Sequence, residues 1–402
     1  MGKEIELSTA ITDIAAGPFG SNLKVECFVP SGFPIIDGAN LKGYKVTDNI
    51  TKFVTEEKAR SLSRSIAHRG DVIVTISGTI GQIAYIPEDS LYDEYLCSQR
   101  QFRVSFDSSM VYVPYLVFYF HTFEGQNKIL SFANQTGVPA LSQPLKNFKK
   151  IRLCLPSLQE QRRIASIVET INDKIENNIK INDNLEQQAQ SYFQELFVDN
   201  ADPEWTTGSI SDLGVVVGGS TPSKAKPEYY TESGIAWITP KDLSINKSKF
   251  ISHGENDITE LGLKNSSATI MPEGTVLFSS RAPIGYIAIA AGEVTTNQGF
   301  KSVVPKPEIG TPFVYFFLKH NLPIIEGMAS GSTFKEVSGS TMKNIPAVIP
   351  DADTLGRFND FCAPIFAQQR ILEEECQSLA ALRDNLLPKL MSGEIDVSDI
   401  QL

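Results

Sequence analysis

Few residues in this 402-residue chain have the types and spacing that covalent chemistry requires. Glu56, Glu57 and Lys58, with Asp48 upstream, form a weak acidic and basic cluster of the kind that a nuclease uses. A solvated helix start explains the cluster better, because acidic residues are favoured in the first turn of a helix. We therefore expect no nuclease chemistry here.

The histidines and cysteines do not form a metal site or a nucleophilic site. The histidines lack metal-ligand spacing: His68, His121, His253 and His320. Two of them, His121 and His320, end matching aromatic runs. Cys97 has no evident partner base. The cysteines are scattered, odd in number and lack a CxxC pair, which favours a reducing cytoplasm over a disulfide framework or a zinc site: Cys27, Cys97, Cys154, Cys362 and Cys376.

Nucleotide-binding and methyl-transfer motifs are absent from the sequence. There is no GxxxxGK[ST] loop, no cofactor-binding glycine turn and no NPPY-like tetrapeptide, and residues 327–335 (GMASGSTFK) resemble the first only superficially. We therefore expect no catalytic residue, no metal and no cofactor, so the remaining question is which elements the chain builds.

The chain contains an internal repeat. Gly70 and Gly81 align with Gly274 and Gly285 at an offset of 204 residues. Further pairs follow at offsets of 202 and 194: Gly32 and Gly234, Leu41 and Leu243, Gly137 and Gly331, Ile151 and Ile345, Pro156 and Pro350. Two copies are too few for a solenoid. They predict two similar modules related by a pseudo-two-fold axis, which suits a nearly two-fold object such as a DNA duplex.

The first part of each repeat predicts an α+β module with an irregular, mainly antiparallel sheet. Short apolar runs bounded by glycines predict strands: VIVTI, QIAYI, TVLFSS and YIAIAA. VPYLVFYFHTF and TPFVYFFLKHNL predict a buried helix that opens at a proline, although their pattern alone also allows a strand.

The second part of each repeat predicts a long helix. From Ser157 to about Phe197 the chain has no proline or glycine, and a heptad seam runs through it: Ile164, Val168, Ile171, Ile175, Asn178, Asn182, Leu185, Ala189, Tyr192 and Leu196. Adding 194 gives a second, mostly apolar seam: Phe358, Cys362, Ile365, Gln369, Leu372, Cys376, Leu379, Arg383, Leu386 and Leu390. The two seams predict helices of roughly 60 Å that pack as an antiparallel coiled coil.

Polar seam residues and helix-end signals refine this prediction. Asn178, Asn182, Gln369 and Arg383 would fix the register, because a shifted partner would leave them buried and unpaired. Capping residues follow a proline at 156–157 and at 350–351. Pro364 should kink the second helix or mark its true start, and Pro388 and Gly393 should end it. An amphipathic hairpin that merely joins domains is the alternative.

The charge distribution leaves room for nucleic-acid binding despite a net charge of −11. Residues 1–150 carry a net charge of 0 and residues 201–350 carry −2, whereas 151–200 carry −3 and 351–402 carry −6. Near-neutral modules allow local basic faces, and a partner could supply further charge. No apolar stretch is long enough for a membrane span, and the N-terminus lacks a secretory signal, so we expect a cytoplasmic protein.

Several motifs resemble a known family. Residues 155–176 (LPSLQEQRRIASIVETINDKIE) close the first module, and residues 382–395 (LRDNLLPKLMSGEI) end the chain. The second module adds GGSTPS, GIAWITPKDL, GTVLFSSRAPIG and TTNQGF. Together they resemble the specificity subunit of Type I restriction–modification systems. The first module departs from the pattern, with residues 17–21 (GPFGS) in place of GGSTP and Ser98-Gln99 in place of Asn297-Gln298.

The resemblance implies a non-catalytic subunit with two target-recognition domains, each reading one half of a split DNA sequence. The helices would form a spacer and bind two modification (methyltransferase) subunits, with restriction subunits joining outside. We accordingly expect recognition domains at 1–155 and 201–349 and helical spacer regions at 156–200 and 350–402. A protein-only coiled-coil adaptor is the alternative, and a self-contained nuclease–methylase fails on the missing motifs.

Loop residues able to bind bases or phosphates are the candidate DNA contacts. In the first module they are Ser21, Asn22, Lys24, Lys42, Tyr44, Lys45, Arg64, Arg69, Arg100 and Arg103. In the second module they are Ser220, Thr221, Ser223, Lys224, Lys226, Lys241, Lys247, Lys249, Arg281 and Lys335. Residues 224–227 and 246–249 are predicted to be exposed basic loops. The glycine loops at 17–21 and 218–223 allow close approach to DNA.

Overall fold

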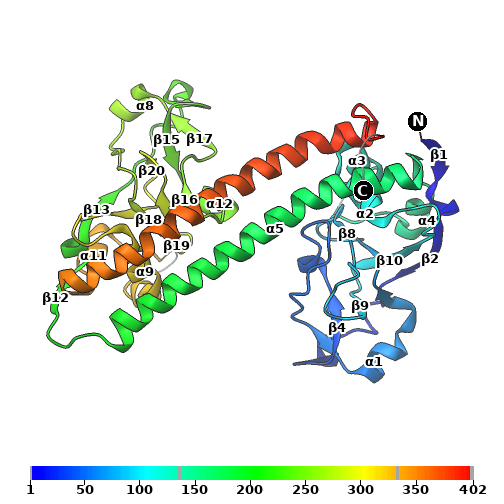
Figure 1. Cartoon of the computed structure of the whole chain (residues 1–402), viewed down its shortest axis with the longest axis horizontal. Coiled ribbons are helices and arrows are strands. Elements are labelled where there is room, and N and C mark those ends of the chain that lie inside the picture. Colours follow the sequence, from blue (N-terminus) through cyan, green and yellow to red (C-terminus); the bar gives the residue numbers. More distant parts are fainter. Residues whose placement is uncertain (1, 135–136, 332–334, 399–402) are drawn as a thin grey trace. The chain divides into compact units, whose positions relative to one another are not determined.

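The computed structural model of the chain describes residues 2–134, 137–331 and 335–398. The chain divides into two compact units, which Figure 1 colours along the sequence. Unit 1 consists of 1–174 and 379–402, and unit 2 consists of 175–378. Each unit therefore contains one copy of the repeated module together with segments of both long helices.

Two sheets and a strand pair form unit 1. The first sheet has the order β2 (Ile11–Ala16), β10 (Gln101–Phe106), β7 (Val72–Thr75), β8 (Ile83–Tyr85). The second has the order β3 (Phe28–Val29), β5 (Phe53–Val54), β4 (Phe33–Ile36), β9 (Glu94–Cys97), β6 (Ile66–His68). β1 (Lys3–Glu6) pairs with β11 (Arg152–Leu155), next to the first long helix. β4 and β9 are parallel, and the other named pairs are antiparallel.

Unit 2 repeats this arrangement. Its first sheet has the order β13 (Gly214–Gly218), β21 (Lys301–Pro305), β18 (Val276–Ser280), β19 (Ile284–Ala290), β16 (Phe250–Ile251). Its second has the order β14 (Tyr230–Thr231), β17 (Asn256–Ile258), β15 (Ile235–Ile238), β20 (Thr295–Thr296). β12 (Thr206–Ser209) pairs with β22 (Pro346–Ile349). The order β13-β21-β18-β19 matches β2-β10-β7-β8, which confirms the predicted repeat.

Backbone conformation explains why the repeat keeps its glycines. Gly70 and Gly274 have φ angles of 81° and 82°, and Gly81 and Gly285 have φ angles of 90° and 93°. These left-handed values favour glycine strongly, because a Cβ atom would clash with the backbone. Gly70 and Gly274 thus lie just before β7 and β18, and Gly81 and Gly285 lie near the start of β8 and β19.

The buried aromatic runs are helices, as predicted. α2 (Val113–His121) and α9 (Thr311–His320) each open with a proline and bury their apolar side chains in the core of their unit. α2 packs on β8, and α9 packs on β19 (Figure 1). His121 Nε2 lies 2.8 Å from the carbonyl oxygen of Ile83, and His320 lies against Phe193. Both histidines thus occupy structural positions at the ends of equivalent helices.

Short helices connect the strands. In unit 1 they are α1 (Glu56–Ser61), α3 (Phe123–Leu130) and α4 (Pro144–Lys149). In unit 2 they are α6 (Ile210–Leu213), α7 (Pro240–Ile245), α8 (Glu260–Lys264), α10 (Leu322–Gly327) and α11 (Gly339–Lys343). The Thr55 hydroxyl caps α1, whose first turn contains Glu56 and Glu57. The acidic cluster is therefore the predicted helix start.

Two long helices complete the fold, α5 (Leu158–Gln194) and α12 (Ala352–Ser392). Ser157 and Asp351 accept the first backbone hydrogen bonds, which confirms the predicted caps. The prediction that Pro364 marks the start of the second helix is wrong, because α12 runs through it. Buried side chains on either side, Cys362 and Phe366, hold this turn in place despite the hydrogen bond that a proline removes.

The end of α12 also differs in part from the prediction. The helix continues through Pro388 because Leu387 and Leu390 are buried in the core of unit 1. Gly393, with a φ angle of 76°, follows the last turn and provides the left-handed residue that commonly ends helices. Among the described residues, no helix is long and apolar enough to cross a membrane.

The polar seam residues pair across the two helices. In unit 2, Asn178 donates to Glu375 at 2.7 Å and Asn182 donates to Glu373 at 3.3 Å. Gln369 donates to the carbonyl oxygen of Asn182 at 3.3 Å. The partner numbers fall along α12 as they rise along α5, so the helices are antiparallel. In unit 1, Arg383 donates to Asn172 at 3.0 Å.

Candidate nucleic-acid interface

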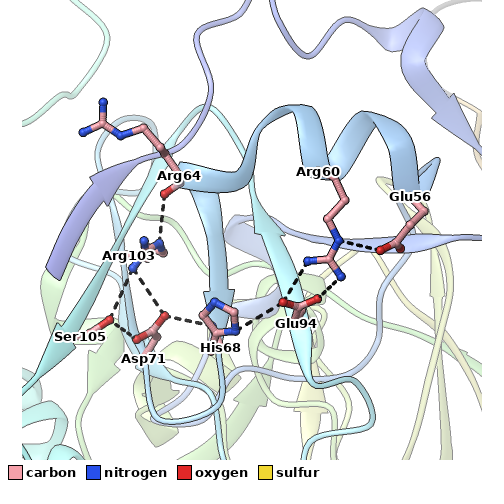
Figure 2. A network of polar contacts seen from close by, with 8 residues as sticks. All are labelled: Glu56, Arg60, Arg64, His68, Asp71, Glu94, Arg103 and Ser105. Carbon is pink, nitrogen blue, oxygen red and sulfur yellow. Dashed lines mark hydrogen bonds and ion pairs between the residues drawn. The ribbon is translucent and has the colours of Figure 1, made fainter.

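One group of the predicted contact residues is exposed and unengaged. Within the described ranges, the side-chain nitrogens of these residues make no hydrogen bond or ion pair: Lys24, Lys42, Arg64, Arg100 and Lys224. Figure 2 shows the Arg64 guanidinium directed away from the neighbouring polar network, which it joins only through its carbonyl oxygen. These cations are free to meet phosphate or base edges without first losing a protein partner.

Tyr44 and Lys45 are engaged within unit 1. The Tyr44 ring is half-buried against Phe118 and His121, and burial raises the pKa of its hydroxyl. Lys45 forms an ion pair with Asp173 of α5 at 3.1 Å. The segment that was predicted to read DNA with an aromatic and a cation therefore fastens the first module to its helix.

Arg69 in unit 1 and most predicted cations of unit 2 have protein partners. Arg69 pairs with Asp93 at 3.0 Å. In unit 2, Lys241 pairs with Glu255, Arg281 pairs with Glu336, and the ammonium groups of Lys226 and Lys247 lie over the rings of Tyr229 and Tyr286. Lys335 is exposed, but Ser332 and Thr333 of its predicted turn lie outside the described residues.

Two residues that were predicted to be exposed contacts are buried. Arg103 is 8% exposed and pairs with Asp13 at 2.6 Å, and its Nε donates to the carbonyl oxygen of Arg64 (Figure 2 shows the latter). Lys249 is 7% exposed and pairs with Glu186 of α5 at 2.6 Å. Composition alone predicts both to be surface cations. In the fold each is buried, and the carboxylate beside it compensates for the loss of water around its charge.

Glu186 is the centre of a charged cluster in unit 2. Lys249 and Lys319 both lie 2.6 Å from its carboxylate oxygens. Burial raises the pKa of the Glu186 carboxyl, but the two ammonium groups outweigh burial, so its pKa lies below its ordinary value. Lys249 also lies 3.7 Å from the centre of the Phe366 ring, and burial lowers the pKa of its ammonium. The cluster fastens strand β16 to both helices. The sequence offered one signal for this cluster, since Glu186 directly follows the predicted seam residue Leu185.

The two glycine loops occupy equivalent positions in their units. A Cβ atom on Gly17 would lie 1.8 Å from the carbonyl oxygen of Ser98, and one on Gly219 would lie 2.0 Å from that of Asn297. Only glycine allows each loop to lie this close to the segment before β10 or β21. The equivalence of Ser98-Gln99 and Asn297-Gln298 is therefore structural as well as sequential.

The loops differ in what they present. In unit 1, Phe19 is 81% exposed. In unit 2, the hydroxyl of Thr221 donates to the side chain of Gln298, and the Ser220 hydroxyl accepts from Ser267. Ser21 and Ser223 are exposed at the ends of the two loops. The same scaffold thus carries two chemically different tips.

A cavity of about 590 Å³ lies beside the first glycine loop. Residues from three segments distant in sequence line it, within 23–28, at 37–39 and at 98–101, together with Thr75 of β7 and the turn at 77–79. Sequence reasoning named Arg100 on its wall but missed Gln82 and Gln101, since isolated glutamines give no distinctive spacing. The sequence signal that could have pointed to this part of the cavity wall was the equivalence of Ser98-Gln99 with Asn297-Gln298.

The acidic residues of unit 1 form a neutralised network rather than a metal site. Arg60 binds Glu94 and Glu56, and Arg103 lies beside Asp71 (Figure 2). Asp48 accepts the backbone N–H of Leu91, far along the chain from α1. In the parts of the chain that the structure describes, no three His, Cys, Asp or Glu side chains are placed to hold one metal ion.

Two copies of one sheet arrangement, each with a glycine loop and a long helix, define a protein of two repeated modules. The chain belongs to the Type I restriction modification DNA specificity domain family, which matches residues 29–187 and 203–373. This membership confirms the predicted resemblance to a specificity subunit, which is a non-catalytic kind of subunit.

Individual relatives agree with the family. The Type I restriction enzyme MjaIX specificity subunit of Methanocaldococcus jannaschii is 39% identical over 194 residues, which cover 46% of this chain and 45% of that protein. The chain thus spans about half the length of this relative. The HindI specificity subunit of Haemophilus influenzae is 22% identical over 392 residues, covering 78% of this chain and 84% of that one.

A solved structure shows the fold. The S subunit of a Type I restriction-modification system from M. genitalium superposes with a TM-score of 0.61 at 16% identity, covering 96% of this chain and 95% of that one. At this identity the likeness concerns the fold alone. It agrees with the two α+β modules and the long helices described above.

Proposed function

We propose that the chain is the DNA-specificity subunit of a Type I restriction–modification complex. It binds a bipartite DNA target through its two modules and has no chemistry of its own. The observation that carries this proposal is the duplication of a DNA specificity domain within one chain, each copy followed by a long helix. Two similar readers with different loops suit a split target whose halves differ in sequence.

The exposed cations and the two glycine loops form the proposed DNA surface. Lys24, Lys42, Arg64 and Lys224 would contact phosphates, and Arg100 would reach base edges. Ser21, Ser220 and Thr221 would approach DNA through small side chains. The remaining predicted cations contact other protein side chains and would have to give up these contacts when they bind DNA: Lys45, Arg69, Lys226, Lys241, Lys247 and Arg281.

The helices carry the proposed protein contacts. We propose recognition domains at 1–155 and 201–349, with helical spacer regions at 156–200 and 350–402. The acidic helices would bind two methyltransferase subunits, and restriction subunits would join through that complex, in the cytoplasm. The net charges of −3 and −6 on these regions favour basic docking surfaces on the partners.

A methylome comparison tests the proposal. Deleting the gene should abolish one split methylation motif, and returning it should restore that motif. A mobility-shift assay with the chain and its modification subunit should show binding that depends on the same motif. A protein-only adaptor would leave the methylome unchanged and would give no sequence-specific shift. Methyl transfer by the chain alone would contradict its assignment as a non-catalytic subunit.

A further inference from the structure

Two glutamine side chains in the lining of the unit 1 cavity are already held in position. Gln82 accepts from the Thr75 hydroxyl at 3.1 Å and donates to the carbonyl oxygen of Gly38 at 3.0 Å. Gln101 accepts from the Ser98 hydroxyl. Side chains held in this way lose little conformational entropy when a ligand binds.

Gln101 retains an unused donor. The residue is 1% exposed and lines the cavity, and its backbone N–H donates to the carbonyl oxygen of Ser98, but its side-chain nitrogen Nε2 donates to no described residue. A ligand in the cavity that accepts a hydrogen bond would use this donor. The side chains of Gln99 and Arg100 line the same cavity without a hydrogen-bond partner among the described residues.

Apolar side chains form part of the cavity wall. Leu23, Val25, Phe28 and Ile35 line the cavity together with the polar residues. This combination of apolar side chains and amide groups suits a heterocyclic base, which stacks with its face and hydrogen-bonds with its edge. The volume of about 590 Å³ falls within the range of roughly 300–1,000 Å³ found for small-molecule sites.

An exposed aromatic residue stands on the loop that leads into this wall. Phe19 accepts the backbone N–H of Asn22 at 2.7 Å, which forms a turn just before Leu23. Its neighbour Gly20 packs so closely that a Cβ atom would lie 2.6 Å from Oε1 of Gln99. Apolar side chains on such loops can enter a base step and unstack it. An 81% exposed phenylalanine beside a base-sized cavity is placed for this role.

We propose that this cavity holds one nucleobase that has left the stack of the DNA half-site read by unit 1. Phe19 would fill the gap in the duplex, and Gln99, Arg100 and Gln101 would bind the edge of the base. A base edge that stays in the groove would not reach a side chain that is 1% exposed, whereas a single unstacked base would. The inference rests on the proposed function and extends it by assigning a base-specific pocket.

Fluorescent base analogues test this inference in the complex of full chain and modification subunits. Duplexes containing the methylome motif would carry 2-aminopurine at one purine, or pyrrolocytosine at one pyrimidine, in each half-site in turn. One position in the half-site of unit 1, distinct from the methylated base, should brighten several-fold on binding. Phe19→Ala should reduce this increase at least threefold, and Phe19→Leu should retain most of it. Gln101→Leu should lower discrimination at that position alone.

Phe123→Ala is the matched control, because Phe123 is 85% exposed in the same unit but belongs to α3 and not to the glycine loop that carries Phe19. It should leave the fluorescence unchanged. Sequence-specific binding without a bright position would overturn the inference and leave the proposed function intact. Loss of sequence-specific binding by the wild type would overturn both. If free adenosine or cytidine monophosphate bound the cavity while no duplex position brightened, the pocket would serve free nucleotides instead, and the inference would be wrong.

Discussion

Units 1 and 2 share the strand order of their central sheets and the φ angles of their hairpin glycines, but they are fastened to the helices differently. Unit 2 uses the buried pair of Lys249 and Glu186, whereas unit 1 uses the half-exposed pair of Lys45 and Asp173. Their loop tips differ as well, with exposed Phe19 in one and hydrogen-bonded Thr221 in the other. The scaffold is repeated, while the attachments and the chemistry of the loop tips have diverged.

The largest expected effect concerns the two attachments. Glu186→Ala should destabilise unit 2 by about 3–5 kcal/mol, because it leaves Lys249 buried without its carboxylate. Lys45→Ala should cost under about 1 kcal/mol, since a surface ion pair contributes little. Urea denaturation followed by circular dichroism measures both. Equal losses in the two variants would contradict the distinction between a buried and an exposed attachment.

Low pH should weaken the attachment of unit 2 that depends on Glu186. The pKa of Glu186 is lowered in the folded protein, so the stability that it contributes is present above the unfolded-state value of about 4.3. That contribution is lost as the pH falls through the lowered folded-state pKa. Unfolding measured between pH 7 and pH 3 should show the acid loss of unit 2 reduced in Glu186→Gln. An unchanged pH profile in that variant would exclude Glu186 as a source of the acid sensitivity.

The predicted DNA contacts sharpen the contrast between modules. Arg100→Ala should cost about 1–3 kcal/mol of discrimination and relax the sequence requirement in one half-site only. Lys224→Ala should weaken binding to all sequences without changing their ranking. Competition binding against single-base variants of the motif measures both. Relaxed discrimination in the other half-site would show that the modules do not read independently.

The smallest effect is electrostatic. Lys24→Ala should reduce the slope of log K against log salt by about 1, as expected when one phosphate contact is lost. Lys249→Met should leave that slope unchanged, because Lys249 is buried in a protein ion pair. Fluorescence anisotropy at several salt concentrations measures the slopes. Equal slopes for Lys24→Ala and the wild type would remove Lys24 from the DNA surface.

Periodicity and repetition predicted most of the fold. The strands around Gly70 and Gly274, the aromatic helices and the heptad seam with Asn178 all follow from local patterns. Long-range pairing was not accessible in the same way. Nothing near Lys249 in the sequence indicates that Glu186 lies beside it, because the two residues are 63 positions apart.

The candidate DNA-binding site was harder to predict from the sequence than the fold, because it also depends on long-range contacts. Composition identified exposed cations such as Arg100 and Lys224, but it could not distinguish them from Arg103, which is buried. The alternative that Pro364 marks the start of the second helix is wrong, because the burial of its neighbours outweighs the local preference of proline. The cavity beside Phe19 depends on three segments that meet only in the fold.

Duplicating one module tests the central claim most directly. In the chimera, a second copy of residues 1–155 would replace residues 201–349, and the methylome of a host carrying it would be determined. Independent readers predict a symmetric motif, with the half-site of unit 1 present twice in inverted orientation. Retention of the original asymmetric motif, or methylation without a split motif by a folded complex, would contradict the account of two modules that each read one half-site.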